Sequence, residues 1–458
     1  MNDRAPEALM QAAQQAVSQA QRDAAQPVHT RHGVCNLCEA ICGLEFKVQG
    51  GRVVSVKGDA SDPLSRGHIC PKAVALKDLH EDTDRLRRPV KRVGEGWQEI
   101  SWDEAFSLAV EGLARVREAH GADAVAVYQG NPTVHSYGQF THGIEFFGLL
   151  NTRHRYSATS VDQLPHQLVA WWLYGHQLLL PIPDVDHTQY LLMLGANPMV
   201  SNGSLMSAPD FRQRLKDLKS RGGRLVVIDP RRTETAALAD EHHFIRPGKD
   251  AALLLAMLYT LFDEDLVRPG RLAAWLDGVD AVRAVVQGYA PEAVAEAVGI
   301  SAPVIRRLAR DLSTAQAGVC YGRIGVSVQE HGVLAQWAIQ MLNILCGHLD
   351  RRGGALFTQP AADLVGGGLS GSGHYDRYRS RVRGLPEFGG ELPVVTMAEE
   401  MLTPGEGQVR ALVVSSGNPV LSTPNGRRLD PALAGLDFMV AFDFYINETT
   451  RHAHLILP

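Results

Sequence analysis

The sequence predicts an α/β protein in which a small antiparallel domain precedes two doubly wound, mostly parallel α/β domains. From Ala124 onward, short apolar stretches alternate with helix-forming stretches, a pattern typical of parallel sheets that are covered on both faces. Before that, residues 44–48 and 53–56 alternate apolar and polar side chains around Gly50 and Gly51, which predicts a hairpin. The chain of 458 residues is longer than a single domain usually is.

Six predicted strands end in loops that are rich in Gly, Asn, Pro and Asp. They are residues 124–128, 190–194, 224–228, 318–321, 411–416 and 438–442. Ligands of parallel α/β folds bind at the carboxyl ends of the strands, so these loops are the candidate binding elements. Ahead of the first strand, Ser101 followed by Glu104 predicts the start of a helix that runs to about His120.

Two of these loops resemble each other. Gly195-Ala-Asn197-Pro and Ser-Gly417-Asn418-Pro each follow an apolar strand, and their asparagines lie 221 positions apart. This suggests an internal duplication that provides two nucleotide-type half-sites, in which backbone N–H groups hold phosphate. A single Gly-Asn-Pro sequence is also an ordinary turn, so the pair is stronger evidence than either loop alone.

Composition and charge exclude several classes of protein. The chain is 45% hydrophobic and 21% charged, with a net charge of −5, so we expect no nucleic-acid partner. No apolar run reaches the roughly 18 residues that a membrane span needs. Residues 1–30 read as a helical or disordered arm and lack the features of a signal peptide. We therefore expect a cytoplasmic location, where a reducing environment suits thiolate ligands.

Four cysteines predict a metal centre near the start of the chain. Cys35, Cys38, Cys42 and Cys70 have the spacing C-x2-C-x3-C-x27-C, and four thiolates select zinc or an iron–sulfur cluster. Structural zinc usually has two paired knuckles or a mixture of Cys and His. The three close cysteines and one distant cysteine fit a [4Fe–4S] cluster better, with zinc as the alternative. A disulfide framework is not expected in a long chain without secretion features.

One acidic residue follows a predicted strand in a way that suits a nucleotide. Asp229, in Asp-Pro-Arg, either forms a simple turn or accepts hydrogen bonds from a ribose or a guanine edge. Asp250, in Arg-Pro-Gly-Lys-Asp, reads as the cap of the helix that follows the turn. Further along, residues 366–383 are rich in Gly and Arg, which favours a mobile surface loop, with a channel or interface segment as the alternative.

Several motifs together resemble one family, the molybdenum and tungsten bis-pterin oxidoreductases. This family includes formate dehydrogenases, periplasmic and assimilatory nitrate reductases, and dimethyl sulfoxide reductase. The resemblance runs from about Cys35 to Pro458. Its motifs are the four cysteines with Cys70-Pro-Lys72 and residues 195–198, 229–236, 246–253, 322–329, 343–354, 417–419 and 447–458.

The resemblance implies the cofactors and the residues that hold them. The cofactors would be a [4Fe–4S] cluster, bound by the four cysteines, and molybdenum or tungsten held by two molybdopterin guanine dinucleotides. Lys72 would lie between cluster and pterin and help electrons pass, although it also reads as a surface lysine. The remaining implied contacts are Asn197, Asp229, Asp250 and nearby Thr233 on one dinucleotide arm, and Gly322, Gly325 and Asn418 near the second arm or the metal.

The protein ligand to the metal departs from the family pattern. The family places Cys, selenocysteine, Ser or Asp in the loop that here contains no cysteine. Ser157 matches best by position and Asp162 is the nearest carboxylate, while the rival interpretation is that Ser157 caps the following helix. His166 or His176 would serve proton transfer, or would simply pack. Arg323 is a candidate for holding a small oxyanion, or forms a structural ion pair.

The family also implies a domain organisation. We expect an arm over residues 1–30, a [4Fe–4S] domain over 31–88, a discontinuous cofactor domain over 89–155 and 320–458, and a second cofactor domain over 156–319. Members of the family usually continue beyond the closing strand, so the resemblance implies a further domain over the cofactor that we do not expect within these 458 residues.

The expected function is that of an oxidoreductase of the formate dehydrogenase and nitrate reductase type. It would pass electrons between a small substrate and a redox partner through the cluster, with the cofactors doing the difficult chemistry. The alternative is an iron–sulfur electron-relay subunit without metal–pterin, resembling the large iron–sulfur subunit of NADH dehydrogenase. Asp229 and Asp250 argue against that alternative, because a relay has little use for guanine-binding acids. A non-redox metal–pterin hydratase or lyase is a third, lesser interpretation.

Overall fold

The computed structural model describes residues 18, 21–22 and 25–458. The chain divides into two compact units, Met1–Arg85 and Leu86–Pro458, and each is described by itself. Most of the arm predicted over residues 1–30 lies outside the described residues. The predicted α/β class, with a small antiparallel sheet followed by parallel sheets, is confirmed.

The first unit is built on a three-stranded antiparallel sheet. Its strands are β1 (His29–Val34), β2 (Gly43–Gln49) and β3 (Arg52–Gly58), and two short helices follow, α2 (Pro71–Val74) and α3 (Leu76–Glu81). The predicted hairpin joins β2 to β3 through Gly50 and Gly51, which both have the positive φ angles (58° and 77°) that the turn requires. Its core is small and includes Leu44, Val56 and Ala73.

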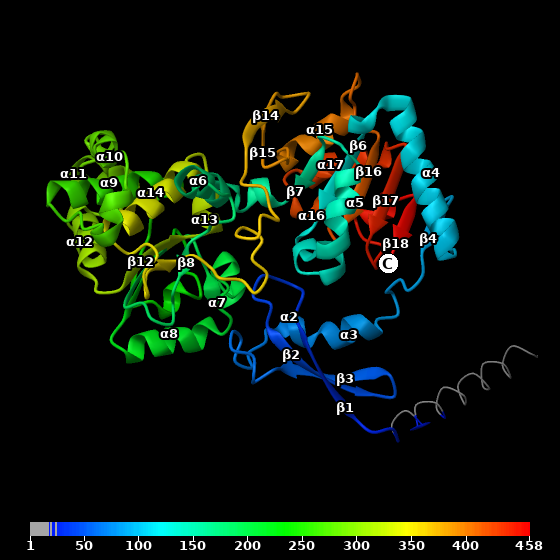
Figure 1. Cartoon of the computed structure of the whole chain (residues 1–458), viewed down its shortest axis with the longest axis horizontal. Helices are drawn as coiled ribbons and strands as arrows, with labels where there is room; N and C mark the ends of the chain where they lie inside the picture. Colours follow the sequence, from blue (N-terminus) through cyan, green and yellow to red (C-terminus); the bar gives the residue numbers. More distant parts are fainter. Residues whose placement is uncertain (1–17, 19–20, 23–24) are drawn as a thin grey trace, which may run out of the picture. The chain divides into compact units, whose positions relative to one another are not determined.

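The second unit contains a four-stranded parallel sheet in the order β11-β10-β9-β12. These strands are β9 (Tyr190–Leu194), β10 (Arg224–Ile228), β11 (Glu241–His243) and β12 (Gly318–Gly322). Figure 1 shows α8 (Phe211–Ser220) on one side of this sheet and α9 (Asp250–Asp263) and α14 (Gly332–Leu345) on the other. Further helices of this half are α6 (Leu164–Tyr174), α10 (Val279–Val286), α11 (Pro291–Val298), α12 (Ala302–Thr314) and α13 (Ile324–Ser327). All five residues of β9 are buried, as expected of a strand covered on both faces.

The second unit also contains a seven-stranded sheet in the order β5-β4-β18-β17-β16-β6-β7. Five strands run parallel: β6 (Val125–Gln129), β7 (Arg155–Ser157), β16 (Ala411–Ser415), β17 (Phe438–Phe442) and β18 (Leu455–Leu457). The hairpin of β4 (Val90–Val93) and β5 (Gly96–Glu99) adds to β18 in antiparallel fashion. The helices of this half are α4 (Trp102–His120), α5 (Ile144–Leu149), α15 (Met397–Leu402), α16 (Pro419–Ser422) and α17 (Gly426–Ala434). Ser101 accepts a hydrogen bond from Glu104 N, which confirms the predicted start of α4.

Strand pairing assigns each segment of the second unit to one of the two sheets. The expected boundary between residues 319 and 320 falls inside β12, which pairs along its whole length with β9. Helix α14 then packs on β12 and α9. Residues 318–345 therefore belong with the four-stranded sheet, because β12 finds its hydrogen-bonding partner there. The other expected domain limits stay predictions.

The stretch that was expected to be a mobile loop includes a strand. Residues 375–379 form β14 (Tyr375–Arg379), which pairs with β15 (Pro386–Phe388). The turn that follows β14 is anchored on α15, because Arg381 pairs with Glu400 at 3.2 Å and Arg383 pairs with Glu399 at 2.6 Å. Both glutamates are buried, whereas the Arg383 side chain is 46% exposed, so the pairs lie where the hairpin meets solvent.

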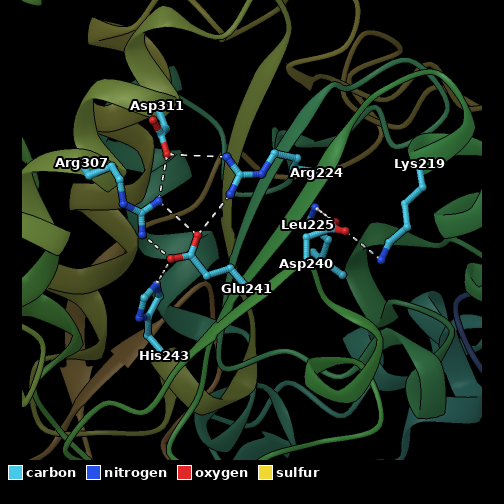
Figure 2. A network of polar contacts seen from close by, with 8 residues as sticks. All are labelled: Lys219, Arg224, Leu225, Asp240, Glu241, His243, Arg307 and Asp311. Atoms are coloured by element: carbon cyan, nitrogen blue, oxygen red, sulfur yellow. Dashed lines mark hydrogen bonds and ion pairs between the residues drawn. The ribbon is translucent and has the colours of Figure 1, made fainter.

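The outer strand of the four-stranded sheet is surrounded by charge. Figure 2 shows Glu241, on β11, receiving contacts from Arg224, Arg307 and His243. Asp311 extends this network and contacts both arginines. The neighbouring Asp240 accepts a hydrogen bond from Leu225 N at 2.8 Å and pairs with Lys219. A charged edge strand resists pairing with the edge of another molecule.

Membrane-spanning helices were not expected from the sequence. Among the described residues, no helix is both long and apolar enough to cross a membrane.

Candidate functional site

The four cysteines of the first unit share one small core. Cys35 and Cys42 are buried, and Cys38 and Cys70 are partly buried against the same cluster. Burial, together with the nearby charges of Cys35, Cys38 and Cys70, raises the pKa of Cys42 to about 11. A thiol in such a place favours a bound cation, because a coordinated thiol is deprotonated outright.

Local turns bring the first three cysteines together. Cys35 N donates to Cys42 O at 2.9 Å and Ile41 N donates to Cys38 O at 3.1 Å, so the loop between β1 and β2 folds back on itself. Cys70 lies immediately before α2. Lys72, on α2, is close enough that its charge lowers the pKa of Cys35, although burial dominates and raises that pKa overall. Within the described part of the chain, no three His, Cys, Asp or Glu side chains form a ready-made metal site.

In the second unit, the loops after β9 and β10 are joined by an Asn–Thr–Glu network. Asn197 Oδ1 accepts hydrogen bonds from Thr235 N and Oγ1, at 3.2 and 2.7 Å. Thr235 Oγ1 in turn accepts from Met199 N at 3.2 Å, and Asn197 Nδ2 donates to Glu234 at 2.8 Å. We call residues 195–201 and 229–235 the first loop pair.

The loops after β16 and β17 repeat this network. Asn418 Oδ1 accepts from Thr449 Oγ1 at 2.7 Å, and Thr449 Oγ1 accepts from Val420 N at 3.2 Å. Asn418 Nδ2 donates to Glu448 at 2.8 Å. We call residues 416–422 and 443–449 the second loop pair. The strand orders β11-β10-β9-β12 and β18-β17-β16-β6 also correspond, which confirms the duplication expected from the sequence.

A close approach of two backbones explains the glycines of the first loop pair. Gly195 has φ +53°, and a Cβ there would lie 2.8 Å from Val326 N and 2.9 Å from Gly325. Gly325 N also donates to Gly195 O at 3.0 Å. Gly322 serves a different purpose, since a Cβ there would meet Ile339 of α14 at 2.5 Å. The structure therefore places Gly325 against the first loop pair and Gly322 in the core beneath it.

Two buried acids and one amide gather beside the first loop pair. Asp229 Oδ1 accepts from Arg231 N at 2.8 Å, and Asp250 Oδ2 accepts from Gln329 Nε2 at 2.9 Å. Burial raises the pKa of both acids, and the charge of Asp229 raises that of Asp250 further, so the two lie near each other. Gln329 Oε1 is buried without a hydrogen-bond donor. This group of acceptors fits the N1–H and amino group of a guanine.

Local contacts of Asp250, Thr233 and Asp443 show which of them cap a helix or close a turn. Asp250 begins α9, but Lys249 precedes it as the cap residue and no side chain caps the helix. Thr233 is buried, and its Oγ1 accepts from Ala236 N at 3.0 Å, which closes the turn after β10. In the second loop pair, Asp443 occupies the position of Asp229, and its Oδ1 accepts from Tyr445 N at 3.1 Å. An acid directly after each strand was the sequence signal that could have identified Asp443.

Ser157 lies at the carboxyl end of β7 and is already engaged. Its Oγ is hydrogen-bonded to Glu391 Oε2 at 2.5 Å and accepts from Thr159 N at 3.1 Å. The second contact closes a turn within the loop. Ser157 does not cap a helix, because the cap residues of the two helical segments that follow are Ala158 and Gln163, and neither segment has a side-chain cap. Burial raises the pKa of Glu391. No sequence pattern indicated Glu391, because 234 residues separate it from Ser157.

Arg323 and His166 meet at the turn after β12. Arg323 pairs with Asp162 at 2.5 Å, and its Nε and Nη2 contact Ser204 Oγ at 3.1 and 2.8 Å. His166 Nε2 contacts the Gly322 carbonyl at 3.0 Å, and burial lowers its pKa to about 4. His176 lies apart, with Nδ1 accepting from Leu178 N at 3.1 Å. Among the described residues, no hydrogen bond joins Ser157 to Arg323 or His166.

The comparison with known proteins agrees with this architecture. The family model for molybdopterin oxidoreductase matches residues 85–458, and the model for the molybdopterin oxidoreductase Fe4S4 domain matches residues 28–80. A solved structure, acetylene hydratase from Pelobacter acetylenicus, superposes with a TM-score of 0.78 at 23% identity, covering 93% of this chain and 62% of that one. At that identity the superposition establishes the fold alone.

Curated relatives cover nearly all of this chain. A nitrate reductase from Symbiobacterium thermophilum is 28% identical, and the match covers 93% of this chain and 59% of the relative. The thiosulfate reductase molybdopterin-containing subunit PhsA of Salmonella typhimurium and formate dehydrogenase H of Escherichia coli are each 26% identical, with 93% of this chain covered. Those matches cover 57% and 61% of the relatives, so the chain spans less than two thirds of their length. The chain belongs to the molybdopterin oxidoreductase family, with a [4Fe–4S] cluster and a molybdenum or tungsten pterin as its cofactors.

Proposed function

We propose that this chain passes electrons between a small substrate and a redox partner protein through its [4Fe–4S] cluster, as an oxidoreductase of the formate dehydrogenase and nitrate reductase type. The observation that carries the proposal is the duplicated Asn–Thr–Glu network. It supports two loops of the same kind at the carboxyl ends of two sheets, which suits a cofactor with two dinucleotide arms.

The residues of the second unit have distinct roles in this proposal. The acceptors Asp229, Asp250 and Gln329 hold the donor edge of one guanine, and Asp443 does so for the other arm. Backbone N–H groups at the starts of α7 (Pro198–Ser201) and α16 face the phosphates. The metal–pterin supplies two-electron chemistry when bound. In the first unit, Cys35, Cys38, Cys42 and Cys70 hold the cluster, and Lys72 lies beside it.

The candidate catalytic residues divide into two groups. Ser157 stays the candidate metal ligand, with Glu391 orienting its hydroxyl through the 2.5 Å contact. Arg323 and His166 act as positioning residues. Their polar atoms bind Asp162, Ser204 and the Gly322 carbonyl, and in this way they fix the turn after β12. Removing either would alter cofactor retention before it altered substrate affinity.

The first experiment is the cofactor content of the anaerobically purified full chain. We expect about four irons, one molybdenum or tungsten, and two GMP released by acid. Cys70→Ser should lose the iron, whereas Cys346→Ala, a change at a buried cysteine of the other unit, should keep it. Four irons without metal or GMP would favour the electron-relay alternative, and zinc would exclude the cluster.

Activity can then be assayed on the loaded chain. Three substrates appear in the names of the relatives. Formate would be assayed with an oxidised viologen dye, and nitrate or thiosulfate with a reduced one. The dye stands in for the proposed partner protein. We also propose a cytoplasmic location, because the four reduced thiols suit a reducing compartment, and cell fractionation with an antibody to the chain would test it.

A further inference from the structure

A cavity of about 670 Å³ lies in the second unit, away from the cofactor loops. Its walls come from residues that precede parallel strands, namely 120–123 before β6, 151–155 before and at the start of β7, and 406–407 before β16. The remaining wall is the base of the β14–β15 hairpin. The cofactor loops follow the strands, so the cavity lies at the opposite, amino-terminal edge of the seven-stranded sheet.

The lining of this cavity is rich in positive charge. Five lining residues are basic or imidazole side chains, namely His120, Arg153, Arg155, His374 and Arg377. Two are acidic, Asp123 and Glu406. Asp123 is already engaged, since it accepts from Arg153 N at 2.8 Å and pairs with the Arg153 side chain at 3.9 Å. The lining therefore has three arginines against two carboxylates, and the buried Glu391 lies close enough behind it that the charge of Arg155 lowers its pKa, although burial raises that pKa overall.

Part of the basic lining is held in place. Glu387 is fully buried and accepts hydrogen bonds from Arg377 N and Gly390 N at 2.9 and 3.0 Å. The same carboxylate contacts Nδ1 of His374, which leaves Nε2 of that ring for another partner. Tyr378 donates to Gly390 O at 2.9 Å, and the Arg153 guanidinium lies 5.9 Å from its ring centre. These contacts give the cavity a wall with a fixed shape.

Other parts of the lining are free to bind. Among the described residues, the side chains of Arg155 and Arg377 make no hydrogen bond or ion pair. Arginine forks bind carboxylate and phosphate groups with two parallel hydrogen bonds. The volume matches that of pockets for small organic ligands and greatly exceeds what a single phosphate needs.

We propose that this cavity binds a small organic molecule carrying two or more oxyanion groups, through Arg155, Arg377 and His374. The ligand is a polyphosphate or a polycarboxylate, and both offer the same acceptor oxygens to the two arginines. The site is separate from the loops that hold the cofactor.

Hydrogen exchange on the cofactor-loaded full chain tests this proposal with pyrophosphate and citrate as probes. We expect at least one probe to protect residues 120–123, 151–155 and 374–378 saturably, and the two arms distinguish phosphate from carboxylate. Protection confined to residues 195–198 and 416–419, or no saturable protection with either probe, would overturn the proposal.

Three variants make the test specific. Arg377→Gln should weaken binding about tenfold, the loss expected for one charge-assisted contact, and His374→Gln should weaken it less. Arg212→Gln changes an exposed arginine of α8 and should bind as the unchanged protein does. Iron and GMP content should be the same in all three variants, which verifies that they fold. Equal affinity of Arg377→Gln and Arg212→Gln would also overturn the proposal.

Discussion

The two loop pairs of the second unit share a scaffold and differ in what surrounds it. In both pairs an asparagine Oδ1 accepts from a threonine hydroxyl at 2.7 Å. Asp250 and Gln329 stand beside the first pair only, through α9 and the segment after α13. The repeated residues therefore determine the loop backbone, while recognition of a ligand depends on segments outside the repeat.

The corresponding positions Gly195 and Ser416 show how neighbours decide a residue. Both have left-handed φ angles, +53° and +51°, and their N–H groups donate to Ile228 O and Phe442 O. At Gly195 the backbone of Gly325 leaves no room for a Cβ. At Ser416 the crossing chain approaches the carbonyl instead, where a Cβ on Gly130 would lie 1.9 Å from Ser416 O. Glycine is therefore required after β9 in the four-stranded sheet, at Gly195, but after β6, the neighbour of β16, in the seven-stranded sheet, at Gly130.

Exchanging these two residues should give the largest effect. We expect Gly195→Ser to lower the free energy of unfolding by about 3 kcal/mol or more, because the backbone must move. Ser416→Gly should change it by less than about 1 kcal/mol. Denaturant unfolding of both variants measures the difference, and bound GMP should fall in the first variant alone. Similar losses in the two variants would contradict the comparison.

The stability lost on replacing each asparagine should follow the number of hydrogen bonds that its Oδ1 accepts. Asn197 Oδ1 accepts two hydrogen bonds from Thr235, whereas Asn418 Oδ1 accepts one from Thr449. Asn197→Ala should therefore cost about 2–3 kcal/mol and Asn418→Ala about 1–2 kcal/mol. Double-mutant cycles with Thr235→Ala and Thr449→Ala isolate the hydroxyl contact, which should have a similar coupling energy in both loop pairs, so the difference between the asparagine variants reports the backbone hydrogen bond of Thr235. A greater loss of stability in Asn418→Ala than in Asn197→Ala would refute this ranking.

Acid should destabilise the turn after β12, which His166 contacts. In this turn Arg323 occupies the position that Gly130 has after β6. The pKa of His166, lowered to about 4 by burial, lies below its unfolded value of about 6.5. The contribution of the neutral, buried His166 to the free energy of unfolding is therefore complete above pH 6.5 and is lost as the pH falls toward 4. Across this pH range the free energy of unfolding should fall by about 3 kcal/mol. His166→Gln should flatten this part of the stability profile, and exposed His331→Gln should leave it unchanged.

The outer strands should show the smallest effect. β11 is an edge strand with Glu241 at the centre of its charge network, whereas β18 is covered by β4. We expect Glu241→Gln to cost about 1 kcal/mol at low salt and less at high salt, as partly exposed ion pairs do. Glu99→Gln, on the edge strand β5, is the matched control. Light scattering would reveal whether the uncharged β11 edge promotes association.

The sequence predicted the elements that depend on local chemistry. The Gly50-Gly51 hairpin, the Ser101 cap and the strand ends of both loop pairs follow from turn residues and alternation, which act within a few positions. The placement of β12 depended on a partner strand more than a hundred residues away, and its own apolar residues suit either sheet. Only packing selects between such alternatives.

The residues of the candidate site also divide into those that a local sequence pattern predicts and those that depend on distant contacts. Asn197, Asp229 and Asn418 lie in loops with a recognisable local pattern, and the structure brings each to the end of a strand. Glu387 and Glu391 lie beyond residues 366–383, the stretch predicted to be a mobile loop, and His374 lies within it. Their importance lies in burial against distant side chains, which no local pattern reports.

The position of β18 has a consequence for synthesis on the ribosome. β4 to β7 are complete by residue 157, but their central partners β16, β17 and β18 lie at residues 411–457. The four-stranded sheet, at residues 190–322, is continuous by comparison and can condense while the rest of the chain is still being made. The early strands must meanwhile wait with open edges, and closing so long a loop is slow. We expect such a nascent chain to need protection from aggregation until β18 inserts between β17 and β4.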